Sequence, residues 1–106
     1  MAFWKIENSL DILISALCLD YTRRQRAIEE RMVTLRTDTE FRYYNFKIFD
    51  AAAEIVGEAD AEKYIEEIGK RIGYANSSFA IISEVTYKKY KSEICKNIAK
   101  KLHLCD

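Results

Sequence analysis

Apolar residues recur at every third or fourth position along most of the chain, the spacing that places them on one face of an α-helix. The first apolar stripe stays in phase as far as Leu35, so the pattern predicts one long helix over about residues 8–35. Arg24 lies inside this segment and marks either a break or a salt-bridged position. The stripe consists of Ile6, Leu10, Leu13, Ile14, Leu17, Tyr21, Ile28, Met32 and Leu35.

Two further helices are predicted in the middle of the chain. One covers about residues 39–56, and Asp38 or Thr39 would cap it while Gly57 would end it. The other starts at the N-cap Asp60 and stops at Gly73. Their apolar faces are Phe41, Tyr44, Ile48, Ala52 and Ile55 in the first helix and Ala61, Tyr64, Ile65, Ile68 and Ile72 in the second.

The last part of the chain has apolar residues on two opposite faces. Ile81, Ile82 and Val85 would point about 180° away from the main stripe if one straight helix ran through this part. A break near Ser83, a residue type that caps helices well, resolves this conflict. We therefore predict a short helix over about 77–82 and a long helix over about 84–103. The main stripe is Tyr87, Tyr90, Ile94, Ile98, Leu102 and Cys105.

Composition agrees with a single all-α domain over residues 1–106. The chain contains no proline and three glycines, with 49% hydrophobic and 32% charged residues. These values argue against a turn-rich β-sandwich and against disorder. The sequence thus predicts a bundle of four to five helices.

Charge is balanced over the whole chain but not along it. The 17 basic and 17 acidic residues cancel. Residues 37–69 hold three basic and nine acidic side chains, whereas residues 70–106 hold eight basic and three acidic ones, a net charge of +5. This asymmetry indicates an anionic partner for the C-terminal third, or else a solvated lysine face.

The cysteines and the apolar segments favour a cytoplasmic protein without a membrane span. Cys18, Cys95 and Cys105 form neither a Cys-x-x-Cys motif nor a zinc-ligand spacing. The apolar stretch Leu10–Leu19 is interrupted by Asp11 and is too short to cross a bilayer. We expect reduced thiols, no signal peptide and no membrane partner.

Residues 61–82 have the spacing of a helix-turn-helix. Ile68, Ile72, Phe79 and Ile82 supply apolar anchors, and Gly69 would let the second helix approach closely. Gly73 would adopt a positive φ in the turn. The second helix would open with Asn76, Ser77 and Ser78, whose side chains could reach base edges or phosphates. Any helical hairpin with a glycine turn would show a similar pattern.

The run from Ser83 to Lys91, Ser-Glu-Val-Thr-Tyr-Lys-Lys-Tyr-Lys, followed by Ile94, Ile98-Ala99 and Leu102, resembles the end of small phage transcription regulators. These regulators, of the ArpU and RinA types, are themselves similar to region four of bacterial sigma factors. The segment Asp20-Tyr21-Thr22-Arg23-Arg24 resembles a stretch of the same small phage proteins. The resemblance implies a helix-turn-helix-like unit over about 60–103 that binds duplex DNA, with RNA polymerase as an alternative partner.

Two positions are open for the recognition helix. Residues 73–79 resemble the second helix-turn-helix of AraC-type regulators, which would place the helix near 76–84. The sigma-like register starts it at Ser83, and the reversal of the apolar stripe there favours this register. The predicted nucleic-acid-binding residues from both registers are Asn76, Ser77, Ser78, Ser83, Thr86, Lys88, Lys89, Lys96 and Lys100.

The runner-up hypothesis is a helical protein–protein interaction module, a homodimeric bundle that does not bind DNA. Its contact would be the long first helix or the aromatic cluster, in which Tyr43 and Phe46 lie off the apolar face. Burial within the fold is the simpler interpretation of this cluster. Arginines 23, 24, 26, 31 and 36 form either a partner surface or an exposed face paired with Glu29 and Glu30.

Enzyme chemistry is not indicated. His103 is the single histidine, and we find no nucleophile–base pair, phosphate loop or nucleotide fingerprint. Glu62, Glu66 and Glu67 are close in sequence, but a solvated face accounts for them better than a metal site does. We therefore predict no catalytic residue, no metal and no cofactor.

Overall fold

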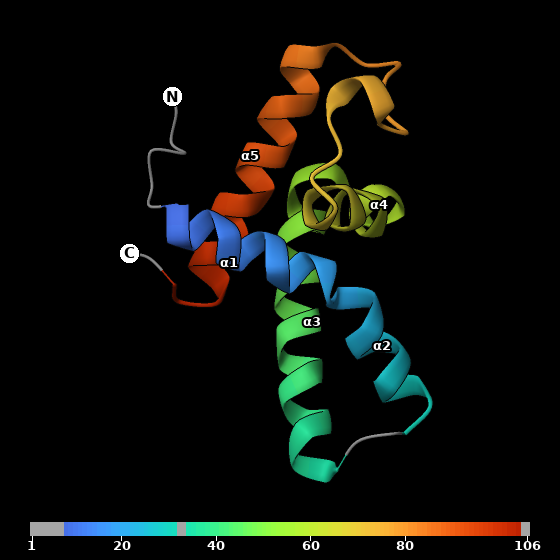
Figure 1. Ribbon diagram of the computed structural model, residues 1–106, viewed down its shortest axis with the longest axis vertical. Coiled ribbons are helices and arrows are strands. Elements are labelled where there is room, and N and C mark those ends of the chain that lie inside the picture. The colour runs from blue at the N-terminus through green and yellow to red at the C-terminus, as the bar shows by residue number, and fades with distance from the viewer. Residues whose placement is uncertain (1–7, 32–33, 105–106) are drawn as a thin grey trace.

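The computed structural model describes residues 8–31 and 34–104. Within these ranges the chain forms five α-helices and one short 3-10 turn, and no strand (Figure 1). Ile6, Met32 and Cys105, which the apolar pattern placed on helical stripes, lie outside the described residues. The elements are α1 (Asn8–Leu19), α2 (Tyr21–Glu29), α3 (Leu35–Val56), α4 (Glu58–Gly69), η2 (Tyr74–Asn76) and α5 (Glu84–Lys101).

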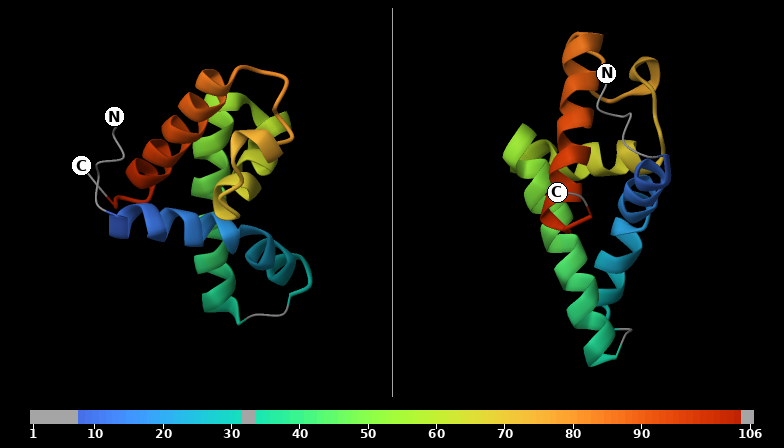
Figure 2. Two further views of the ribbon diagram at one scale, coloured as in Figure 1. Left: turned by 45° about the horizontal axis from the view of Figure 1, so that its top comes forward. Right: turned by 90° about the vertical axis from the view of Figure 1, so that its left-hand side faces the viewer.

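The long helix α3 is the element around which the others are arranged. Its first half packs against α2, and its second half packs against α4 and α5 (Figure 1). Helix α1 crosses over and packs on α4 and α5, as both views in Figure 2 show. The core lies where α1, α3, α4 and α5 meet, and its fully buried aliphatic side chains are Ile14, Ile48, Ile65, Ile94 and Ile98.

The predicted single helix over residues 8–35 is wrong, because the chain turns at Asp20 and separates α1 from α2. The turn lets α2 run back along α3 and buries Arg24, which is only 4% exposed. The Arg24 guanidinium donates to Asn45 Oδ1 at 2.7 Å and to the Leu17 carbonyl at 2.6 Å, and it pairs with Asp20 at 3.4 Å. A buried arginine needs such partners. Arg24 is thus the salt-bridged position that the sequence indicated, next to the break.

The ends of α3 and α4 follow the predictions in part. Helix α3 begins at Leu35, earlier than expected, because Thr34 and not Asp38 or Thr39 accepts the capping bond, from the Thr37 amide. It ends before Gly57, as predicted, and Gly57 has φ of 89°.

Helix α4 begins directly after Gly57, so Asp60 is not its N-cap. It ends at Gly69 and not at Gly73. Arg71, with φ of 55°, occupies the left-handed position expected of Gly73, which has φ of −82°.

The predicted short helix over 77–82 is wrong as well. Residues 74–76 form η2, and residues 78–82 form turns and a bend in which Ile81 is 97% exposed. The break at Ser83 is confirmed, because its side chain accepts the Thr86 amide at 3.1 Å and α5 follows directly. Residues 70–83 separate α4 from α5, whereas a helix-turn-helix joins its helices by a turn of about three to four residues.

Gly69 is a point of close approach, but its partner is not the one predicted. The backbone of Leu19, at the end of α1, lies against it, and a Cβ added at Gly69 would be 2.5 Å from the Leu19 nitrogen. Helix α1 can therefore cross α4 only where the α4 residue has no side chain. Gly73 has nothing within 4 Å of an added Cβ.

We predict that Gly69→Ala lowers the free energy of unfolding by about 2 kcal/mol or more, because backbone must move to admit the methyl group. The matched variant Gly73→Ala should change it by less than about 0.5 kcal/mol, since the site is open and its φ suits alanine. Urea denaturation followed by circular dichroism measures both. Equal stability of the two variants would contradict the close crossing of α1 over α4.

Candidate nucleic-acid interface and the groove beside it

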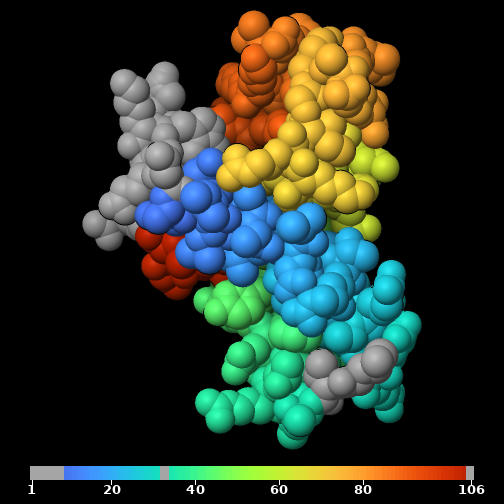
Figure 3. Space-filling view, in the orientation of Figure 1, coloured from blue at the N-terminus to red at the C-terminus, as the bar shows by residue number. Residues whose placement is uncertain are grey.

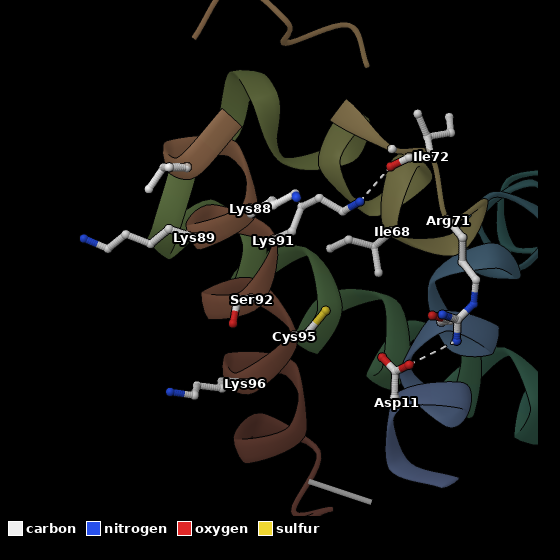
Figure 4. Close-up of a pocket in the computed structure, with 13 residues that line it drawn as sticks. Asp11, Ile68, Arg71, Ile72, Lys88, Lys89, Lys91, Ser92, Cys95 and Lys96 are labelled. Atoms are coloured by element: carbon white, nitrogen blue, oxygen red, sulfur yellow. Dashed lines mark hydrogen bonds and ion pairs between the residues drawn. The ribbon is translucent and has the colours of Figure 1, made fainter. Parts of the chain in front are cut away.

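Three lysines form a stripe along the solvent side of α5. Lys89, Lys96 and Lys100 are exposed, and at 3.6 residues per turn they fall within about 40° of one direction. Figure 4 shows Lys89 and Lys96 extending from α5 away from Arg71 and Asp11. We call Lys89, Lys96 and Lys100 the outer stripe. Side chains of one charge sign aligned in this way suit a polyanion.

The other predicted contact residues of α5 lie near its first turn. Lys88 is exposed and pairs with Glu84 at 2.8 Å. The Ser83 and Thr86 hydroxyls are hydrogen-bonded to each other at 2.8 Å, and Ser83 caps the helix. Ser83 and Thr86 therefore have a structural role at the start of α5.

Asn76, Ser77 and Ser78 do not open an α-helix, contrary to the AraC-like register. Asn76 is exposed at the end of η2, whereas Ser77 and Ser78 bind the buried side chain of Glu67. Ser77 donates its hydroxyl to Glu67 Oε1 at 2.6 Å, and the Ser78 amide donates to Oε2 at 2.9 Å. Ser77 and Ser78 therefore have a structural role, as ligands of the Glu67 carboxylate.

Glu67 is the most consequential polar residue that sequence reasoning misjudged. The predicted solvated face is wrong for this side chain, which is 2% exposed. Besides Ser77 and Ser78, the Tyr87 hydroxyl donates to Glu67 Oε1 at 2.6 Å. Burial alone would raise the pKa of Glu67, but these hydrogen bonds together hold it below its ordinary value. One signal was present in the sequence, because Glu67 falls three residues after Tyr64, on the apolar face of α4.

Further contacts fix residues 70–83 around this carboxylate. The Phe79 ring stacks on Tyr64, with centroids 4.1 Å apart. The Tyr74 hydroxyl donates to the Ala80 carbonyl at 2.7 Å and also bonds the Ile82 carbonyl. In the space-filling view these residues, coloured yellow to orange, run from beside α1 to the first turns of α5 (Figure 3). We call residues 70–83 the connecting segment.

A groove lies between α5, the end of α4 and α1, directly beside the outer stripe, and Lys89 and Lys96 belong to both. Its volume is about 870 Å³, and Figure 4 shows its labelled residues. Ile68 and Cys95 lie at its base, and Ile72 and Val85 add apolar surface. The charged residues along it are Asp11, Arg71, Lys88, Lys89, Lys91 and Lys96.

Arg71 and Lys91 belong to this groove and were not predicted as site residues. Arg71 pairs with Asp11 of α1 at 3.2 Å. The Lys91 ammonium donates to the Ile72 carbonyl at 2.8 Å and lies 5.0 Å from the centre of the Tyr87 ring. Burial lowers the pKa of Lys91, while the charge of Glu67 opposes this effect. These residues could not be found as a group, because the fold alone brings α1, the connecting segment and α5 together.

The surfaces assigned to the runner-up hypothesis are only partly as expected. In the aromatic cluster Phe41 and Phe49 are half-buried, but Phe46 is 65% exposed, so burial does not account for the whole cluster.

The predicted pairing of the arginines with Glu29 and Glu30 is wrong. In the described part of the chain Arg23 and Arg24 pair with Asp20, and Arg36 pairs with Glu40.

The described residues contain no group of three or more His, Cys, Asp or Glu side chains that could hold a metal ion. None of the helices in this part of the chain combines the length and apolar character that crossing a membrane requires. Cys18 and Cys95 are buried free thiols, and burial raises the pKa of each. Comparison of the chain with protein-family models, with curated proteins and with solved structures finds no match.

We predict that Glu67→Gln lowers the free energy of unfolding by about 2–3 kcal/mol, because an amide replaces a carboxylate that accepts three hydrogen bonds. The neighbouring variant Glu66→Gln removes two exposed pairs, with Lys63 and Lys70, and should cost less than about 0.5 kcal/mol. Urea denaturation at neutral pH measures both. A Glu67→Gln protein as stable as Glu66→Gln would contradict the role given to this carboxylate.

The same pair of proteins gives a pH prediction. Because folding lowers the pKa of Glu67 from 4.5, its contribution to stability is present above that pH and is lost as the pH falls through the lowered pKa. The stability advantage of the natural chain over Glu67→Gln should therefore shrink below about pH 4.5. An advantage that stays constant down to about pH 2.5 would show that the charge of Glu67 is not responsible.

Proposed function

We propose that this chain is a non-enzymatic, DNA-binding transcription regulator of the phage or prophage type. The observation that carries the proposal is the outer stripe of Lys89, Lys96 and Lys100, aligned on the solvent side of α5. Lysines in this arrangement neutralise phosphates and give affinity for DNA that does not depend on the base sequence. The resemblance of the Ser83–Lys91 run to sigma-like phage regulators supports the same conclusion.

In this proposal α4, the connecting segment and α5 form a divergent helix-turn-helix-like unit, and α5 is its recognition helix. The first half of α5 reaches one end of the molecule, opposite α2 and the start of α3, so a duplex can approach it (Figure 1). Lys88 and Lys89 on the early turns lie where recognition helices contact the duplex, and Lys96 and Lys100 follow the backbone. Lys101 is not part of this face, because it pairs with Asp50 at 2.9 Å and with Glu54 at 2.8 Å.

A second candidate function is protein–protein contact as a homodimer. It is favoured by exposed apolar side chains on the first half of α3, where Leu35 is 83% and Phe46 is 65% exposed. Such side chains on one helix face mark an interaction surface. Analytical ultracentrifugation separates the two functions, because a dimer that does not bind DNA supports this candidate and a DNA-binding monomer opposes it.

We predict that the double variant Lys89→Glu/Lys100→Glu weakens binding to a mixed-sequence duplex by tenfold or more, because two phosphate contacts become repulsive. Fluorescence anisotropy at about 50 mM and about 200 mM salt measures the affinity, and the slope of log affinity against log salt should fall by about two. Circular dichroism confirms that helicity is retained.

The matched control is Arg36→Glu/Lys63→Glu, which makes the same change in net charge at the start of α3 and on α4, where both side chains are exposed. Its affinity should stay within about threefold of the natural chain. If the control loses as much affinity as the α5 variant, binding depends on net charge and not on the outer stripe. If the natural chain does not bind the duplex at the lower salt, the proposal fails.

A further inference from the structure

We infer that the groove between α5, α1 and the end of α4 binds an acidic amphipathic helix of a partner protein. This surface adjoins the outer stripe and shares Lys89 and Lys96 with it. The inference does not rest on DNA binding. The inference stands on three properties of the groove: an apolar base, cations along its edges and a length that suits a helix.

The apolar base gives the site a preference for a ligand with its own apolar side chains. Ile72 is half-buried and Val85 is 79% exposed, and Ile68 and Cys95 close the groove beneath them. A phosphate backbone has no apolar groups for such a surface, whereas one face of an amphipathic helix does. The base therefore favours a protein segment over a nucleic acid.

The charges along the groove are strongly unequal. Three basic residues, Arg71, Lys88 and Lys91, line it against one acidic residue, Asp11. Lys89 and Lys96 of the outer stripe add two further cations along its α5 edge. Asp11 is engaged by Arg71 and Lys88 by Glu84, and both pairs are exposed enough to exchange partners. A ligand with carboxylates beside its apolar face would be complementary to this surface.

The length of the groove selects a helix over a small anion. Its α5 side extends from Val85 to Lys96, which at a rise of 1.5 Å per residue is about 16 Å, or about three helical turns. The cations are distributed over that length, from Lys88 near one end to Lys96 at the other. A single carboxylate or phosphate head could engage one part of this array, whereas an acidic helix can engage all of it.

The walls of the groove are held in place without a ligand. The Lys91 ammonium bonds the Ile72 carbonyl, and Glu67 ties the connecting segment to α5 through Tyr87. Because the site is formed in the free protein, this chain loses little conformational entropy when a helix binds to it.

The probe is a synthetic fluorescein-labelled peptide of about fifteen residues, with leucines at every third or fourth position and glutamates at most of the others. Fluorescence anisotropy should show saturable binding to the natural full chain. A peptide with serine for each leucine, and one with lysine for each glutamate, should each bind at least tenfold more weakly. Loss of binding in only the second peptide would mean that charge alone is recognised, which would overturn the inference.

Substitutions on the protein locate the site. Lys88→Glu should weaken peptide binding by about tenfold, and Val85→Ser by severalfold, because they remove an edge cation and exposed apolar surface. Both side chains are exposed, so circular dichroism and urea unfolding should remain near those of the natural chain. The matched control Lys63→Glu on α4 should bind within about twofold.

Three results would overturn the inference. The first is that the natural chain fails to bind the acidic peptide. The second is that Lys63→Glu weakens binding as much as Lys88→Glu, and the third is that Val85→Ser leaves binding unchanged. A chain that binds DNA but not the peptide would retain the proposed function and lose only this inference, and the reverse result would retain only the inference.

Discussion

Much of the C-terminal half is organised by one buried carboxylate. An ionised side chain in a protein interior costs several kcal/mol unless its oxygens are hydrogen-bonded. Glu67 meets this requirement with donors from two places, Ser77 and Ser78 in the connecting segment and Tyr87 on α5. Each charge-assisted bond contributes about 1.5–3 kcal/mol. The hydrogen bonds to the Glu67 carboxylate therefore fix the path of the connecting segment and the position at which α5 begins relative to α4.

This constraint gives α5 two different free sides. Tyr87 and Ile94 are buried in the core, so the outer stripe faces solvent and the groove side faces α1 and Arg71. Lys91 belongs to the same arrangement, since its ammonium donates to the carbonyl of Ile72 within the connecting segment. The polarised charge of the sequence thus becomes two adjoining basic surfaces that share Lys89 and Lys96, one facing solvent and one with an apolar base.

The sequence was informative where a local pattern determines the structure. The reversal of the apolar stripe placed the start of α5 at Ser83, and Lys89, Lys96 and Lys100, which were predicted as binding residues, are exposed on that helix. The local patterns failed where contacts between residues far apart in the sequence determine the structure. The first stripe continues in phase through Asp20, and Arg24 left open whether the helix breaks. The contact of buried Arg24 with Asn45 on α3 accompanies the turn and is not visible in the stripe. Phe79 and Ile82 looked like helix anchors, but Phe79 stacks on Tyr64 within an irregular segment.

The most direct test of this account is amide hydrogen exchange at Ser78, measured by NMR at neutral pH. The amide of Ser78 lies in a segment without regular helix, yet it donates to the buried Glu67 carboxylate at 2.9 Å. We expect slow exchange at Ser78, comparable to that of amides within α4. Exchange at the rate of an exposed loop would contradict the central place given to Glu67.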